Sequence, residues 1–71
     1  MRTDLRNARI SAGLTQQQVA VAIGKDQGTY SRYESGAMAP DKDVALLLAA
    51  ALGMQVLDVL YPEAPVKTEA A

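Results

Sequence analysis

The sequence contains no cysteine and no histidine among its 71 residues. Without cysteine, neither a disulfide framework nor a thiolate metal site can form. Without histidine, the chain lacks the commonest general base, pH switch and metal ligand. The sequence also shows no cluster of carboxylates typical of an active site. We therefore expect no cofactor, no metal and no catalytic residues, and an enzyme is the least favoured class of function.

Aromatic residues are scarce as well, since the chain has three tyrosines but no phenylalanine and no tryptophan. The hydrophobic half of the sequence consists mainly of leucine, valine, isoleucine and alanine. A length of 71 residues predicts one small domain. Such a small core stabilises a monomer by only about 3–5 kcal/mol, so oligomerisation is plausible from size alone.

Long hydrophobic runs are missing too. The longest one, residues 44–54, contains a glycine and is shorter than the segment of about 20 residues that spans a bilayer. Nothing in the sequence resembles a signal peptide. We therefore expect no membrane partner and a cytoplasmic, nucleoid-associated location, and the absence of cysteine agrees with a reducing compartment.

Basic charge is limited: the formal net charge is −1 and the isoelectric point is about 5.1. Since phosphate affinity comes from lysine and arginine, this balance at first argues against a nucleic-acid partner. The charges are unevenly distributed, however. Residues 1–40 hold five basic and three acidic residues, whereas residues 41–71 hold two basic and five acidic ones. Such asymmetry indicates a partner surface on one side of the domain.

Glycines and capping residues divide the chain into helices. A glycine follows each of four helical patterns, where it can adopt the left-handed cap: Gly13, Gly24, Gly36 and Gly53. Thr15 and Gln18 form a capping-box pattern, and Asp26 and Asp41 can cap the next two segments. The sequence therefore predicts an all-α fold with five helices, over residues 4–12, 16–23, 27–35, 42–52 and 56–60.

Helical spacing also predicts which side chains face the core. These are Leu5, Ala8, Arg9 and Ala12; Val19, Ala20 and Ile23; Tyr30 and Tyr33; Val44, Leu47, Leu48 and Ala51; and Val56, Val59 and Leu60. The segment 24–26 is a three-residue turn between two short helices, which is the helix-turn-helix geometry. We expect the domain to cover residues 1–61 and residues 62–71, with two prolines and mixed charge, to be a flexible tail.

The segment GLTQQQVAVAIGKDQGTYSRYESG, followed by Pro40 and LLLAAALG, resembles the DNA-binding domain of the Cro and phage-repressor (XRE) family. The resemblance covers about residues 4–61. It implies a compact five-helix bundle of the lambda-repressor-like type with its helix-turn-helix at the second and third helices. It further implies that the helix at 27–35 enters the major groove of DNA, and that a homodimer covers two half-sites of a palindromic operator.

The resemblance also implies the residues that contact DNA: Gln27, Gly28, Thr29, Ser31 and Arg32 on the recognition helix, and Gln16 at a phosphate. Glutamine can pair with adenine and arginine with guanine. Lys25 stands where an apolar turn residue is common and can reach a phosphate. Gly28 offers no side chain where the family often has a base reader, so either the backbone approaches DNA closely there or the position is not read. The simpler alternatives are capping for Gln16 and a solvated surface position for Arg32.

Two further sets of residues follow from the resemblance. It places Arg9 and Glu34 together as a structural ion pair that is at least half-buried. The segment 42–52 is apolar almost all round, so part of it is either central or covered by a partner. Since the family commonly dimerises through its fifth helix and neighbouring residues, we expect a dimer interface formed by Leu46, Met54, Val56, Leu57 and Leu60.

The sequence thus favours a transcriptional regulator, more specifically a repressor, that binds operator DNA as a homodimer without a cofactor. A protein-interaction module on the same scaffold, such as an antitoxin that binds a partner protein, is the alternative. The acidic isoelectric point, Gly28 and the expected flexible tail fit that alternative. A chain of 71 residues leaves no room for a sensor domain, so we expect control through the protein's own concentration.

Overall fold

The computed structural model describes residues 2–62 of the chain. These residues form five helices joined by short turns and loops. They are α1 (Thr3–Ser11), α2 (Gln16–Ala22), α3 (Gln27–Ser35), α4 (Lys42–Leu52) and α5 (Val56–Leu60). No strand occurs within these residues, and the predicted all-α fold is confirmed. Each predicted helix matches the observed one to within one residue at either end. The tail predicted to be flexible comprises residues 62–71, of which 63–71 lie outside the described residues.

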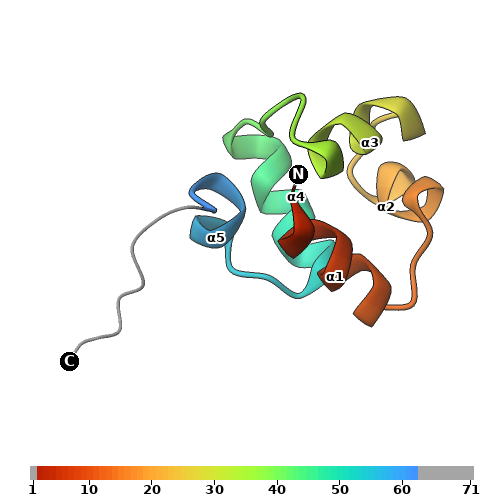
Figure 1. Ribbon diagram of the computed structural model, residues 1–71, viewed down its shortest axis with the longest axis horizontal. Coiled ribbons are helices and arrows are strands. Elements are labelled where there is room, and N and C mark those ends of the chain that lie inside the picture. Colours follow the sequence, from red (N-terminus) through yellow and green to blue (C-terminus); the bar gives the residue numbers. More distant parts are fainter. Residues whose placement is uncertain (1, 63–71) are drawn as a thin grey trace.

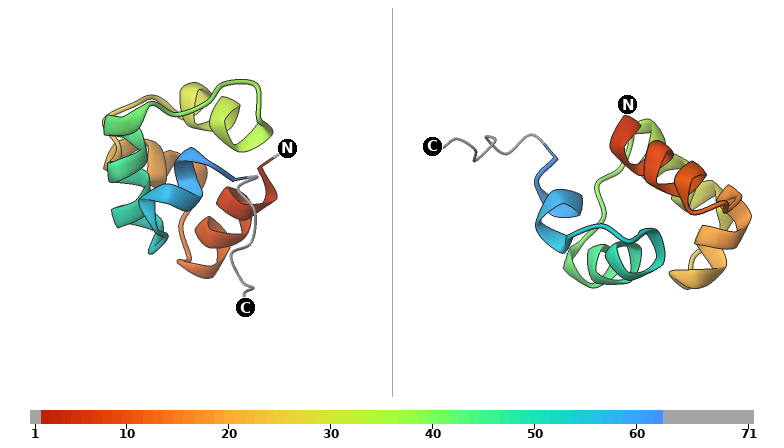
Figure 2. Two further views of the ribbon diagram at one scale, coloured as in Figure 1. Left: turned by 90° about the vertical axis from the view of Figure 1, so that its left-hand side faces the viewer. Right: turned by 90° about the horizontal axis from the view of Figure 1, so that it is seen from below.

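The helices pack around α4. Figure 1 shows α2 and α3 on one side of the domain and α5 on the other, with α1 and α4 between them. Helix α3 contacts both α1 and α2, while α5 contacts α4, and the two views of Figure 2 agree with this arrangement. One face of α3 is therefore held by neighbouring helices, and its opposite face lies at the surface.

The core is formed by one cluster of buried side chains drawn from all five helices and the residue that ends α2: Leu5, Val19, Ala20, Ile23, Tyr30, Tyr33, Val44, Ala45, Leu48, Leu52 and Val59. The inward positions predicted for the second and third helices are confirmed. Tyr30 is the largest fully buried side chain and supplies the bulk that the missing phenylalanine and tryptophan would otherwise provide.

Two predicted core positions are wrong. Leu47 is 46% exposed, because the buried arc of α4 runs through Ala45, Leu48 and Leu52. Successive residues of a helix are rotated by about 100° around its axis, and this rotation places Leu47 outside the buried arc. Its three-residue spacing from Val44 is helical but does not bring it to the core side. Ala12 is exposed because α1 ends at Ser11 and Ala12 is its C-cap.

The helix ends are capped as the sequence predicts. Thr15 and Gln18 form a reciprocal capping box at the start of α2. Asp26 and Asp41 each accept a hydrogen bond from the backbone N–H three residues later. Gly36, with φ of 88°, and Gly53, with φ of 68°, end α3 and α4 in the left-handed conformation that other residues adopt only with strain. Short helices thus begin and end at defined residues.

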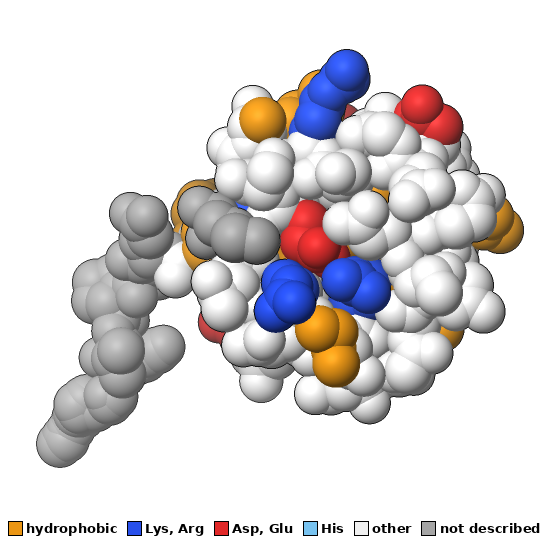
Figure 3. Space-filling view, turned by 45° about the vertical axis from the view of Figure 1, so that its right-hand side comes forward, with side chains coloured by type: hydrophobic (Ala, Val, Ile, Leu, Met, Phe, Trp, Pro, Cys, Tyr) orange, Lys and Arg blue, Asp and Glu red, His pale blue; other side chains and the backbone are white. Residues whose placement is uncertain are grey.

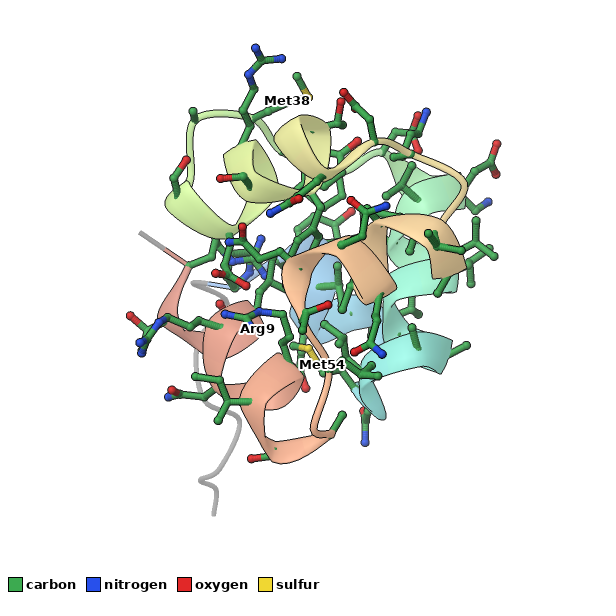
Figure 4. The ribbon with its side chains drawn as sticks, turned by 90° about the vertical axis from the view of Figure 1, so that its right-hand side faces the viewer. Arg9, Met38 and Met54 are labelled. Atoms are coloured by element: carbon green, nitrogen blue, oxygen red, sulfur yellow. The ribbon has the colours of Figure 1, made fainter. Side chains whose placement is uncertain are left out.

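A buried carboxylate joins three helices. Glu34 Oε2 on α3 accepts hydrogen bonds from Arg9 Nε on α1 at 2.7 Å and from the Tyr30 hydroxyl at 2.8 Å. Its other oxygen, Oε1, accepts from Gln16 Nε2 at the start of α2 at 2.9 Å. Arg9 Nη1 also donates to the carbonyl of Leu14 at 3.0 Å. Figure 4 shows Arg9 pointing from α1 into the centre of the domain. We call Arg9, Gln16, Tyr30 and Glu34 the Glu34 network.

The charges in the Glu34 network are largely removed from water, with side-chain exposures of 15% for Arg9 and 5% for Glu34. Burial alone would raise the pKa of Glu34, but the hydrogen bonds from Arg9, Gln16 and Tyr30 outweigh it, so the pKa lies below its usual value of 4.5. Burial, together with the neighbouring Glu34 carboxylate, raises the pKa of Tyr30. The carboxylate is therefore ionised and the phenol is neutral at neutral pH.

Replacing Glu34 by alanine should destabilise the domain by up to about 3–5 kcal/mol, a large share of the stability of so small a core, because the change leaves the largely buried Arg9 guanidinium without its partner. Urea unfolding followed by circular dichroism measures the loss. Asp58→Ala is the control, since that side chain is exposed and makes no ion pair with a described residue. A Glu34→Ala protein as stable as the parent would contradict a structural role for the network.

The Glu34 network should also make stability depend on pH. Because the folded-state pKa of Glu34 lies below its unfolded value of 4.5, the contribution is complete above pH 4.5 and is lost as pH falls further. The free energy of unfolding should therefore fall more steeply on acidification in the parent than in Glu34→Gln, which has no proton to bind there. Identical slopes in the two proteins would show that Glu34 is not stabilised as an anion.

Candidate nucleic-acid interface

Helices α2 and α3 form a tight helix-turn-helix unit. The turn is closed by backbone hydrogen bonds from Gly24 N to Val21 O at 3.1 Å and from Lys25 N to Ala20 O at 2.9 Å. Ala20 is fully buried between the helices. Because its side chain is a single methyl group, α3 can pack closely against α2. The unit therefore has the geometry that places a second helix in the major groove.

Helix α3 has two distinct faces. Tyr30, Tyr33 and Glu34 are buried and hold the helix to the domain. Gly28 and Arg32, four residues apart, lie on the opposite face and are exposed, as is Gln27 at the start of the helix. Thr29 and Ser31 lie on the flanks and are half-buried. The predicted DNA-contacting residues of α3 are thus brought together on one outward side.

The first turn of α3 is organised by Asp26. Its oxygen Oδ1 accepts a hydrogen bond from Thr29 N at 3.3 Å and another from the Thr29 hydroxyl. These two bonds from Thr29 lower the pKa of Asp26, so the carboxylate is ionised at neutral pH. The Thr29 hydroxyl uses its one hydrogen to donate this hydrogen bond to Asp26. Its oxygen can still accept a hydrogen bond, and its methyl group can contact a thymine methyl.

Gly28 is not required by the folded structure. A Cβ atom placed there would meet only Asp26 Oδ2, at 3.7 Å, which is an ordinary van der Waals distance. Its backbone is not in the left-handed region, unlike that of the four glycines that end helices. The glycine in this outward position therefore needs an explanation other than the fold of the free protein.

The remaining predicted DNA contacts lie in α2 and in the turn. Lys25 is exposed in the turn, where its side chain is available to a phosphate. Gln16 is half-buried, and its amide nitrogen donates to Glu34. The sequence did not indicate this bond. Gln16 therefore links the start of α2 to α3.

Charge is sparse on the side of the domain that carries α2 and α3. Figure 3 shows mostly uncharged polar surface there, with few basic groups. Among residues 2–40, Arg2 pairs with Asp4 and Arg9 with Glu34. Arg6, Lys25 and Arg32 make no ion pair with a described residue. So few cations limit the sequence-independent part of DNA affinity, which comes from attraction to phosphates.

The residues predicted for dimerisation fall into two groups. Leu46 on α4 and Leu57 on α5 are 51% and 63% exposed. Met54, Val56 and Leu60 are half-buried and pack against the protein's own core, and Figure 4 shows Met54 pointing inward. Tyr61, directly after α5, is 60% exposed and was not singled out from the sequence. The exposed apolar surface of α4, α5 and the residue after α5 is thus carried mainly by Leu46, Leu47, Leu57 and Tyr61.

Fold and site together define a helix-turn-helix DNA-binding protein. A family model described as helix-turn-helix (HTH_3) matches residues 5–59. The chain therefore belongs to the HTH_3 family of XRE-type DNA-binding regulators, which are generally not enzymes. Searches of curated proteins and of solved structures found no significant match. Within residues 2–62, no helix is long and apolar enough to cross a membrane.

Replacing Gly28 by alanine should raise the free energy of unfolding of the unbound protein by about 0.4–1 kcal/mol, because the new methyl group fits and the unfolded chain loses conformational freedom. Thermal unfolding without DNA measures the effect. Gly36→Ala is the matched control and should destabilise, since Gly36 has a φ of 88°. A lower melting temperature for Gly28→Ala would mean that the fold itself requires the glycine.

Proposed function

We propose that this protein is a transcriptional repressor that binds a palindromic operator as a homodimer, with α3 in the major groove. The observation that carries the proposal is the division of α3 into a buried anchoring face and an exposed polar face, within a chain of the XRE-type helix-turn-helix family. A dimer on two half-sites occludes the promoter region that it covers, so repression needs no further activity and no cofactor.

Base recognition rests on Gln27 and Arg32. Both side chains are exposed. The amide of Gln27 can form two hydrogen bonds with adenine, and the guanidinium of Arg32 can form two with guanine O6 and N7. Lys25 and the short side chain of Ser31 contact the phosphates that border these bases. Gln16 acts mainly through its bond to Glu34, which orients α3, rather than as a free phosphate ligand.

Dimerisation rests on the exposed leucines of α4 and α5. Leu46 and Leu57 expose about half or more of their surface, 51% and 63%, which is unfavourable for a monomer in water. Met54, Val56 and Leu60 are half-buried and pack against the core, so they can add only part of their surface to such an interface. A second copy of the chain that covers these leucines pairs two α3 helices about one DNA turn apart, as a palindromic operator requires.

Selection of bound sequences from random DNA duplexes at a stated salt concentration tests base recognition. The parent should return a palindrome, and Arg32→Ala should weaken binding to it by about 1–3 kcal/mol. Arg6→Ala removes the same charge from α1 and should weaken binding to all sequences alike. If the parent returns no common sequence, the operator function fails and the protein-interaction alternative gains support.

The dimer is tested by Leu57→Glu. The charge that this substitution places on the exposed surface of α5 should shift the protein from dimer to monomer, while the fold is kept. Sedimentation at about 10–100 µM protein measures the shift. Ile10→Glu is the control, since Ile10 on α1 is 50% exposed and lies outside the proposed interface. A parent that sediments as a monomer at these concentrations would rule out the proposed dimer.

A further inference from the structure

We propose that Asp26 reads a base: its free carboxylate oxygen accepts a hydrogen bond from the N4 amine of a cytosine in the major groove, and Gly28 leaves the space for that contact. The inference rests on the proposed function, because it requires the exposed face of α3 to meet base edges. It gives Asp26 a second role beside helix capping. It also supplies the reason for a glycine that the fold does not need.

The two oxygens of Asp26 have different surroundings. Oδ1 accepts both hydrogen bonds from Thr29 and is thereby fixed at the helix start. Oδ2 accepts no hydrogen bond from a described residue and lies 3.7 Å from the position where a Cβ of Gly28 would stand. Asp26 and Gly28 are both exposed. A carboxylate oxygen is therefore held in a fixed place beside the outward face of α3.

The chemistry of this oxygen selects cytosine among the four bases. An ionised carboxylate can only accept hydrogen bonds, and Asp26 is ionised at neutral pH because the bonds from Thr29 lower its pKa. In the major groove, guanine and thymine present acceptors to it, which repel a carboxylate. Adenine presents its N6 donor beside the N7 acceptor, whereas the N4 amine of cytosine stands without an acceptor on the same base.

Gly28 makes the contact possible. It occupies the middle of the exposed face, one helical turn before Arg32. A side chain at Gly28 would begin 3.7 Å from Asp26 Oδ2, and a longer one would crowd the approach of a base edge to that oxygen. The first turn of α3 therefore presents an acceptor, and the second turn presents the Arg32 donors. The two can read a cytosine and a guanine in the same half-site.

The Asp26 carboxylate also weakens binding to DNA sites that lack this cytosine. Near DNA its charge is unfavourable unless a donor meets it, so sites without the cytosine amine bind less well. Arg32 lies on the same exposed face, and its positive charge contributes to the low pKa of Asp26. Asp26 thus lowers affinity for DNA in general and raises the ratio of specific to non-specific binding.

The test compares sequences selected from random duplexes by the parent, Asp26→Asn and Asp26→Ser. Asparagine and serine cap helices about as well as aspartate, so all three proteins should fold and melt alike. Asp41→Asn is the matched control: Asp41 is the exposed cap of α4, bonded to Val44 N at 2.9 Å, and its replacement removes the same charge. Asp41→Asn should keep the base preferences of the parent.

The parent should select a cytosine at one position of each half-site, and changing it to thymine should weaken parental binding by about tenfold or more. For Asp26→Asn and Asp26→Ser the same change should cost less than about twofold, because no carboxylate remains to discriminate. If the parent selects a clear operator but Asp26→Asn keeps every base preference, the inference is overturned while the proposed function stands. If the parent selects no sequence at all, the proposed function itself has failed.

Discussion

The arrangement of this domain depends on the buried carboxylate of Glu34, which accepts hydrogen bonds from groups on α1, α2 and α3. Removing a charge from water is costly, and it is tolerated here only because both carboxylate oxygens have donors. The same requirement fixes geometry, since Arg9, Gln16 and Tyr30 must all converge on one point. The angle between the two helices of the helix-turn-helix unit is therefore set by a polar contact as well as by apolar packing around Ala20.

The orientation of α3 links this constraint to DNA binding. Tyr30 and Glu34 anchor one side of α3, so the opposite side, with Gly28 and Arg32, is presented as a rigid surface. A small domain with few basic residues cannot depend on attraction to phosphates. An anchored helix reduces the loss of backbone freedom that binding would otherwise cost. The Glu34 network thus fixes the orientation of the helix whose outward side carries Gly28 and Arg32.

Local signals predicted the helices well, because Thr15, Asp26, Asp41 and the glycines after the helices act on neighbouring residues only. The Arg9–Glu34 pair followed from family resemblance, since no local rule connects residues 25 positions apart. Leu47 was misplaced because spacing alone does not show which arc of an almost wholly apolar helix faces inward. The bond from Gln16 to Glu34 and the position of Asp26 Oδ2 beside Gly28 depend on how helices pack and side chains rotate, which a sequence pattern does not record.

At the start of α3, a single residue, Asp26, uses only one of its two carboxylate oxygens to stabilise the helix. Oδ1 of Asp26 holds the helix, and Oδ2 accepts no hydrogen bond from a described residue. Aspartate, asparagine and serine cap helices with comparable strength, yet aspartate leaves an acceptor oxygen free, asparagine leaves an amide donor, and serine leaves no second polar group. A lineage that exchanges these residues at the cap can therefore change the operator that it recognises while the protein continues to fold. Regulators built on this unit can acquire new targets through substitutions that their own stability does not oppose.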